Sequence, residues 1–262
     1  MAAGAYARII EHIFFAHYKK GARSFDFRRE EILEACRNLK IEPVDNPGDV
    51  VYSFRYRNKY PKRILDTLAK GEEWIIRGAG PARYKFLRVP ETKIEPKQGA
   101  YRIKVPDATP EIVAQYALSD EQALLAKVRY NRLIDIFTGI TTYSLQNHLR
   151  TQVEGGQIEV DELYVGIGKT GAQFILPVQA KGGKDRIGRV QLEQDIAYCE
   201  KAFSNLICRP IAAQFMADDV IAMFELTIDN DEVSIVDEKH YLLVPADQIG
   251  PKDLETMSRG LK

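Results

Sequence analysis

The feature that most constrains this chain is a pair of apolar stretches separated by a short glycine-rich segment, between residues 157 and 181. QIEVDELYV and AQFILPVQAK are of strand length and rich in Val, Ile and aromatic residues, and GIGKTG between them favours a tight reversal. We therefore predict a β-hairpin that turns at Lys169–Thr170. In this hairpin Asp161 lies opposite Val178 or Gln179, and Gln179 and Lys181 project from one face because they are two residues apart.

The same glycine-rich segment invites a second interpretation, as a phosphate-binding loop. That motif requires glycine where Leu163 stands, and its lysine must be followed by a helix. The residues that follow here have the pattern of a strand, so we expect no nucleotide cofactor.

The hairpin belongs to a longer alternation of elements in the second half of the chain. The pattern predicts a helix over 119–137, strands near 143–153, 157–167 and 173–181, a helix near 189–203 and further strands at 207–216, 220–227 and 240–244. This order, α-β-β-β-α-β, predicts a mixed sheet flanked by helices over 119–262. Residues 90–118 contain four prolines and little periodicity, and we interpret residues 91–118 as a linker.

The first 90 residues have a different pattern. Apolar spacing predicts helices at 4–19, from Phe27 to about 39, and from Pro61 to Gly71, with a turn at 42–49. Two short strands follow at 72–78 and 82–89. Three helices followed by a hairpin favour a winged helix, so we expect an α+β protein of two domains.

The charge of the chain is divided unevenly between its halves. Residues 1–104 hold 22 basic and 13 acidic residues, whereas residues 105–262 hold 15 basic and 24 acidic ones. A basic half joined to an acidic half indicates polyanion binding, although a chance partition of charge gives the same count. No apolar run is long enough for a membrane helix, and three scattered cysteines indicate neither disulfides nor a cysteine zinc site. A reducing, cytoplasmic location fits this composition.

Basic and aromatic residues are interleaved in FRYRNKYPKR at 54–63 and continue on the expected wing. Such side chains contact phosphates, and a helix of this kind enters a major groove. The alternative is a winged helix for protein contacts, with ordinary solvated charge. The DNA-binding candidates are Arg55, Arg57, Lys59, Tyr60, Lys62, Arg63, Arg77, Arg83 and Lys85, joined by Lys184 and Arg186 after the hairpin of the second domain.

The polar residues of the hairpin suit phosphodiester hydrolysis. A carboxylate, an amide oxygen and an ammonium group are expected side by side at Asp161, Gln179 and Lys181. Mg²⁺ binds oxygen ligands, keeps several waters and needs only one or two carboxylates. We therefore expect Mg²⁺ as the cofactor, with Mn²⁺ able to replace it.

This set of residues resembles the PD-(D/E)XK nuclease superfamily, with VD at 160–161 followed by QAK at 179–181. The resemblance covers roughly residues 119–227. It implies that Asp161 is the central metal ligand, that the main-chain carbonyl of Ala180 is a further ligand and that Lys181 is the motif lysine. Gln179 stands where the family usually has an acid, which removes one negative charge from the expected site.

The missing charge makes a helper acid part of the prediction. Glu121, on the helix before the sheet, resembles the acid that the first helix of this family often contributes, and Glu159 shares a strand face with Asp161. Gln194 and Tyr198 match a Q-x-x-x-Y signature found in one branch of these nucleases. Both lie on one predicted helix face and are further DNA-binding candidates; an exposed polar stripe is the alternative.

The resemblance implies cleavage of double-stranded DNA, and we expect a type II restriction enzyme acting as a homodimer, since two sites must cut two strands. A structure-specific or repair nuclease of the same superfamily is the first alternative. The second is a winged-helix transcription regulator whose second domain does not cleave.

Overall fold

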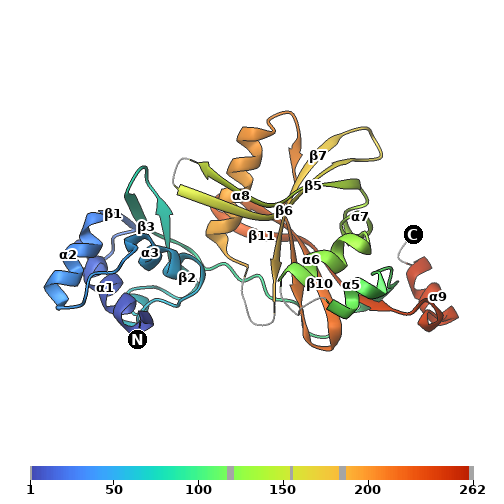
Figure 1. The fold of residues 1–262 in the computed structure, drawn as a ribbon, viewed down its shortest axis with the longest axis horizontal. Coiled ribbons are helices and arrows are strands. Elements are labelled where there is room, and N and C mark those ends of the chain that lie inside the picture. Colours follow the sequence, from blue (N-terminus) through green and yellow to red (C-terminus); the bar gives the residue numbers. More distant parts are fainter. Residues whose placement is uncertain (1, 117–120, 154–155, 183–186, 260–262) are drawn as a thin grey trace.

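The computed structural model describes residues 2–116, 121–153, 156–182 and 187–259. It confirms an α+β protein: helices accompany one three-stranded sheet near the N-terminus and one larger mixed sheet formed by the later residues. Figure 1 shows these two parts next to each other along the longest axis of the molecule.

The N-terminal part is a helical layer packed on a small antiparallel sheet. Its elements are α1 (Ala2–His17), β1 (Ser24–Arg28), α2 (Glu30–Leu39), α3 (Pro47–Tyr56), α4 (Lys62–Leu65), β2 (Glu72–Gly78) and β3 (Arg83–Pro90). The strand order is β1-β3-β2. The apolar stripe of α1, which includes Ile9, Ile13 and Phe14, is buried against Trp74 and Phe86 of the sheet, so the amphipathic pattern fixes how this helix packs.

Three details of this part differ from the sequence-based expectation. The stretch expected as a turn at 42–49 contains the start of α3, because the Asn46 side chain accepts a hydrogen bond from the Gly48 amide and Pro47 occupies the first turn. The helix expected from Pro61 to Gly71 is only the single turn α4. Strand β1 was not predicted; it pairs with β3 along five residues.

Residues 91–118, expected as a linker, contribute an element to the larger sheet. They contain β4 (Arg102–Pro106), which pairs in parallel with β11 from His240↔Arg102 to Val244↔Pro106, and the short helix α5 (Glu111–Tyr116). The strand is short and lies at the sheet edge, which explains why periodicity did not reveal it.

The larger sheet has the strand order β4-β11-β10-β9-β7-β6-β5, with β8 paired to β7. Its remaining elements are α6 (Glu121–Tyr130), α7 (Leu133–Thr138), β5 (Thr141–Val153), β6 (Gly156–Ile167), β7 (Gln173–Lys181), α8 (Arg189–Ala202), β8 (Ile207–Cys208), β9 (Ile211–Phe215), the 3-10 turn Ala217–Asp219, β10 (Val220–Asp229), β11 (Glu232–Val244), the 3-10 turn Ala246–Gln248 and α9 (Pro251–Arg259). Strands β5, β6 and β7 form an antiparallel meander, and α8 connects β7 to the parallel strand β9.

Helices cover both faces of this sheet. Leu124, Val128 and Ile134 of α6 and α7 pack on one face with Val178 and Ala180 of β7. On the other face, α8 contributes Leu192 to one apolar cluster and Cys199 to another. Alternate residues of β7 are therefore directed to opposite layers, with Gln179 and Lys181 on the side of α8.

Pro177 lies within β7, where proline is uncommon because it removes an amide donor. Its pairing with Leu163 of β6 is continuous with the neighbouring pairs, so no bulge is present between these strands. On the other side, β8 pairs with Phe174 and Ile175, and β9 begins to pair at Val178. Pro177 falls between these two partners, where the missing amide costs no ladder hydrogen bond.

The two parts are joined by a polar contact between β2, α3 and the helix α8. Arg77 donates two hydrogen bonds to Glu193, of 2.6 and 2.7 Å, and the Tyr56 hydroxyl donates to Gln194 Oε1 at 2.8 Å. Ile75 and Val190 pack together beside them. Helix α8 therefore contacts the N-terminal part on one face and the larger sheet on the other. None of the helices in the described residues is long and apolar enough to span a membrane.

Candidate active site

The candidate site lies where β6 and β7 separate. The two strands pair from Ile167↔Gln173 to Glu162↔Val178, and continuing this register puts Asp161 opposite Gln179. At this point Asp161 Oδ2 accepts a hydrogen bond of 2.9 Å from the Ala180 amide, so a side-chain carboxylate replaces the next main-chain acceptor of the ladder. The carboxylate is thereby fixed against β7 at the end of the pairing.

Burial and charge have opposing effects on Asp161. Burial raises the pKa of the Asp161 carboxyl above its usual value, while the Lys181 ammonium and the Ala180 amide act in the opposite direction. Glu159 raises it further, and His148 lowers it. The charge of Lys181 therefore favours the ionised form of Asp161 in a poorly solvated place.

Gln179, the third predicted residue, is 3% exposed and is directed toward α8. Its Nε2 donates a hydrogen bond of 2.8 Å to Asp195 Oδ2, and its Oε1 has no hydrogen-bond partner among the described residues. Gln179 is therefore next to Asp161 in register and connected to a residue that the sequence analysis did not single out.

Asp195 is the acid that sequence reasoning missed. It is 1% exposed, and burial raises the pKa of its carboxyl well above the usual value; the Gln179 hydrogen bond opposes that rise. A signal was present in the sequence. Leu192, Asp195 and Cys199 are spaced by three and four residues and are all buried, so an acid interrupts an apolar helix stripe.

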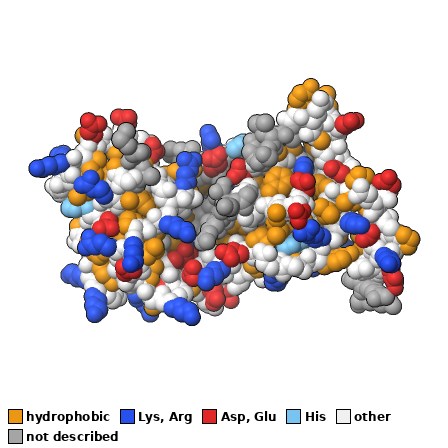
Figure 2. All heavy atoms as spheres, turned by 90° about the horizontal axis from the view of Figure 1, so that it is seen from below, with side chains coloured by type: hydrophobic (Ala, Val, Ile, Leu, Met, Phe, Trp, Pro, Cys, Tyr) orange, Lys and Arg blue, Asp and Glu red, His pale blue; other side chains and the backbone are white. Residues whose placement is uncertain are grey.

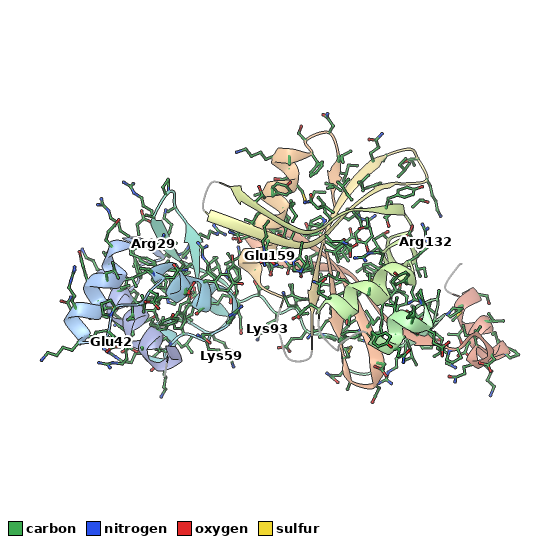
Figure 3. The ribbon with its side chains drawn as sticks, viewed as in Figure 1. Arg29, Glu42, Lys59, Lys93, Arg132 and Glu159 are labelled. Atoms are coloured by element: carbon green, nitrogen blue, oxygen red, sulfur yellow. The ribbon has the colours of Figure 1, made fainter. Side chains whose placement is uncertain are left out.

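The two candidate helper acids lie at the edge of this site. A Cβ atom on Gly182, directly after Lys181, would lie 4.0 Å from Glu121 Oε1, so the acid of α6 is near the end of β7. Glu159 lies on the side of the larger sheet that faces the N-terminal part (Figure 3). Its Oε1 is 3.1 Å from both His148 Nδ1 and Arg150, and the Arg150 guanidinium forms an ion pair with it.

A divalent cation is compatible with this donor set. Among the described residues, no three His, Cys, Asp or Glu side chains gather closely enough to bind a metal together. The expected ligands are of another kind, because they combine the Asp161 carboxylate with the Ala180 carbonyl and the unpartnered Gln179 Oε1. Mg²⁺ prefers such hard oxygen donors and completes its shell with water, so these three oxygen donors fit this ion.

The predicted DNA-binding residues of the N-terminal part divide into two groups. Arg57, Lys59, Lys62 and Arg83 are exposed, and Figure 2 shows Lys and Arg side chains scattered over this half of the molecule. Lys85 pairs weakly with Asp26, at 3.6 Å, and Arg63 pairs with Glu11 at 2.7 Å while remaining largely exposed.

Three others of these residues have structural roles instead. The Tyr60 hydroxyl is buried, so it does not face solvent where DNA would lie. Arg55 donates to the main-chain carbonyl of Ile76, and Arg77 is held by Glu193 at the contact between the two parts. The sequence pattern identified their charge or aromaticity correctly but carried no information on which neighbours would bind them.

The Gln194 and Tyr198 pair does not face the candidate site. Gln194 accepts the hydrogen bond of Tyr56, and Tyr198 packs edge-to-face on Phe203 with ring centres 6.2 Å apart. On α8 it is Gln191, donating to the Glu159 carbonyl at 3.3 Å, and Asp195 that approach β6 and β7. Lys184 and Arg186 lie outside the described residues.

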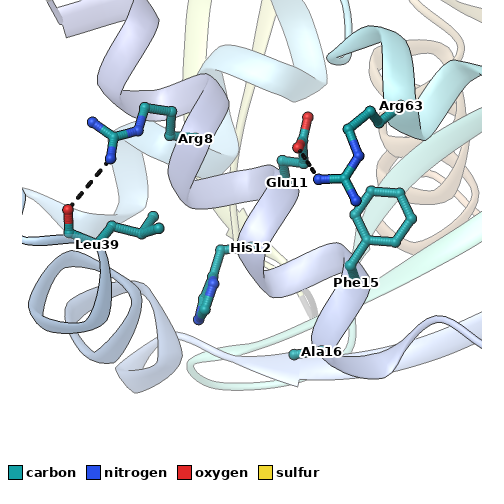
Figure 4. Close-up of a pocket in the computed structure, with 7 residues that line it drawn as sticks. All are labelled: Arg8, Glu11, His12, Phe15, Ala16, Leu39 and Arg63. Atoms are coloured by element: carbon teal, nitrogen blue, oxygen red, sulfur yellow. Dashed lines mark hydrogen bonds and ion pairs between the residues drawn. The ribbon is translucent and has the colours of Figure 1, made fainter.

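A cavity lies elsewhere, in the N-terminal part (Figure 4). It has a volume of about 430 Å³ and is bordered by α1, the end of α2 and Arg63. The Arg63 guanidinium lies over the Phe15 ring and pairs with Glu11, and Arg8 donates to the Leu39 carbonyl, so these charged groups already have partners within the protein. This cavity is separate from Asp161 and Lys181.

Comparison of the chain with protein-family models, with curated proteins and with solved structures finds no match.

Proposed function

We propose that this chain is a magnesium-dependent endonuclease that hydrolyses phosphodiester bonds of double-stranded DNA. The observation that carries the proposal is the convergence of Asp161, Gln179 and Lys181 at the point where β6 and β7 separate, with Asp161 bound to the Ala180 amide. A carboxylate, an amide oxygen and an ammonium group at one sheet edge are the groups that phosphodiester hydrolysis requires.

The arrangement of the larger sheet supports this proposal. Helices α6 and α7, the meander β5–β7, helix α8 and the strands β8 and β9 are compatible with the α-β-β-β-α-β order that the resemblance to PD-(D/E)XK nucleases implies. In that pattern the central acid and the lysine lie on the second and third strands, which correspond here to β6 with Asp161 and β7 with Lys181.

Each residue has a distinct role in the proposed reaction. Asp161 and the Ala180 carbonyl hold the divalent cation, and Lys181 stabilises charge that develops on the phosphate and orients the attacking water. Glu121, near the end of β7, adds negative charge that Gln179 does not supply. When bound, Mg²⁺ lowers the pKa of a coordinated water and neutralises the phosphate.

The N-terminal part suits DNA binding in this proposal. Its order α1-β1-α2-α3-α4-β2-β3, with the sheet order β1-β3-β2, is compatible with the winged helix that we propose. Exposed Arg57, Lys59 and Lys62 lie between the end of α3 and the start of α4, and exposed Arg83 is the first residue of β3. We propose that these residues contact phosphates, so Lys62→Ala lowers the salt dependence of DNA affinity by a slope of about one.

The decisive test is digestion of supercoiled plasmid with Mg²⁺, with Mn²⁺ and with a chelator. Asp161→Asn keeps an acceptor for the Ala180 amide but removes the charge, and Lys181→Ala removes the ammonium. We expect each to reduce cleavage by roughly 10²–10³-fold or more. Lys169→Ala, exposed at the opposite end of the same hairpin, is the matched control and should retain full activity.

The products also distinguish the kinds of nuclease. Discrete fragments would indicate a restriction enzyme, whereas non-specific nicking would indicate a repair enzyme. Sedimentation would detect the homodimer expected of a restriction enzyme. Intact plasmid with both metals, together with tight DNA binding, would contradict the proposal and favour a regulator. Full activity of either site variant would exclude the assigned site.

A further inference from the structure

A buried acid behind the candidate site has no role in the mechanism described above. Asp195 lies on α8, on the face directed toward β7, and is 1% exposed. Its Oδ2 accepts the Gln179 Nε2 hydrogen bond at 2.8 Å, and its Oδ1 has no partner among the described residues. No guanidinium or ammonium group pairs with Asp195 within the part of the chain that the structure describes.

Packing does not explain an acid at this position. The neighbours on the same helix stripe, Leu192 and Cys199, are buried and belong to apolar clusters. An apolar residue would continue that stripe, whereas a buried carboxyl with one unsatisfied oxygen opposes folding. Asp195 forms its hydrogen bond with Gln179. We therefore ask how Asp195 affects the side-chain amide of Gln179.

The hydrogen bond determines which end of the Gln179 amide is occupied. An amide has one donor end and one acceptor end, and only the oxygen can bind a cation. Because Nε2 donates to Asp195, Oε1 is left as the free end, and it is buried without a partner among the described residues. A carboxyl acceptor also polarises the amide and increases the negative charge on its oxygen.

We propose that Asp195 is a positioning residue that orients Gln179 so that its oxygen, and not its nitrogen, is offered to the divalent cation beside Asp161. The inference rests on the proposed function, because it gives the glutamine at the usual acid position a metal-binding role. Asp195 acts through Gln179 and touches neither metal nor DNA. This arrangement makes α8 part of the metal site even though its Gln194 and Tyr198 face elsewhere.

Two substitutions separate orientation from packing. Asp195→Asn keeps an oxygen acceptor for Gln179 in the same shape. Asp195→Leu removes the acceptor and suits the apolar neighbours, so the variant should fold. We expect the affinity for Mn²⁺ alone, measured by calorimetry on the full chain, to fall roughly 10- to 100-fold in the leucine variant and to change less than about threefold in the asparagine variant.

The role through Gln179 is tested by a double-mutant cycle. If Asp195 acts only by orienting Gln179, Mn²⁺ binds to Gln179→Leu/Asp195→Leu as it does to Gln179→Leu alone. The Mn²⁺ concentration for half-maximal cleavage should rise in the Asp195→Leu variant, with the maximal rate recovering at high Mn²⁺. Glu200→Leu, which changes an exposed acid on the same helix, should affect neither quantity.

The outcomes distinguish the two proposals. Cleavage by the unaltered protein combined with unchanged Mn²⁺ affinity in Asp195→Leu overturns the role of Asp195 and leaves the nuclease proposal intact. Additive losses in the double variant also overturn it, because they indicate an independent effect of packing. Absence of both Mn²⁺ binding and cleavage in the unaltered protein contradicts the proposed function itself, and the role of Asp195 with it.

Discussion

The contact between the two parts of the molecule allows a quantitative prediction about Glu193. This carboxylate accepts two hydrogen bonds from Arg77, of 2.6 and 2.7 Å, and one of 2.7 Å from Arg189 Nε. The two arginines differ in their exposure. The Arg77 side chain is 34% exposed, whereas the Arg189 side chain is 1% exposed, and its two terminal nitrogens have no hydrogen-bond partner among the described residues.

The difference in burial sets the expected magnitudes. Arg77→Met removes a bidentate ion pair that solvent partly screens, so the free energy of unfolding should fall by only about 1 kcal/mol. Glu193→Gln also leaves the buried Arg189 without its nearest charge, because Asp231 lies 3.5 Å away and is itself 73% exposed. Removing one partner of a buried pair costs about 3 kcal/mol, so Glu193→Gln should be the more destabilising change.

The single tryptophan, Trp74, lies in the N-terminal sheet and reports on that part of the molecule. Urea unfolding followed by its fluorescence, together with circular dichroism for the whole chain, measures both variants. Lys239→Met, which disrupts an exposed ion pair with Asp237, is the control and should change stability by less than about 0.5 kcal/mol. Equal losses in Arg77→Met and Glu193→Gln would refute the reasoning, since Arg189 would then not depend on Glu193.

Other parts of the fold allow three further predictions. Gly166→Ala should destabilise the protein by about 2–3 kcal/mol, because a Cβ atom there would lie 2.9 Å from the Thr141 carbonyl oxygen. Gly188→Ala should be neutral, because a Cβ atom at Gly188 would have nothing within 4 Å. Thermal unfolding compares the two variants, and equal stability would contradict the predicted clash. Burial raises the pKa of Glu73 above 4.5, so the protonated side chain favours the folded state, and this contribution to stability is lost as pH rises through the folded-state pKa. Glu73→Gln should therefore be more stable than the unaltered protein at about pH 7 and should show no gain below about pH 4. Urea unfolding at the two pH values measures both free energies. A hydrogen bond to the Cys208 thiol and burial raise the pKa of Cys199, so Cys199 should react with a disulfide reagent only after unfolding. Rapid labelling of Cys199 in the native protein would contradict this prediction.

The hairpin of the candidate site shows how much local sequence can predict. Its strands were expected at 157–167 and 173–181, and β6 and β7 occupy 156–167 and 173–181. Strand periodicity and turn-forming glycines are local properties, so the hairpin and the shared face of Gln179 and Lys181 followed without knowledge of the rest of the chain. Asp161 was expected opposite Val178 or Gln179, and the continued register selects Gln179.

The errors occurred where a partner distant in sequence decides the outcome. Strand β4 has five residues and no clear alternation, and it becomes a strand because β11 offers an edge for parallel pairing. Arg77 was expected on a DNA-binding wing, but Glu193, more than a hundred residues away, holds it. Gln194 was expected on DNA and instead accepts from Tyr56. Charge and polarity are visible in a sequence, whereas the neighbour that satisfies them is not.

The sequence by itself determined the α+β class, the hairpin and the identity of Asp161, Gln179 and Lys181 as neighbours, because strand alternation and turn chemistry act over a few residues. Only the tertiary structure decided what lies behind that hairpin. Helix α8 crosses from β7 to β9, and this connection brings Asp195 to within 2.8 Å of Gln179 while the opposite helix face contacts the N-terminal part. A carboxyl group is buried at this cost only when the packing of the whole domain brings a hydrogen-bond partner to it.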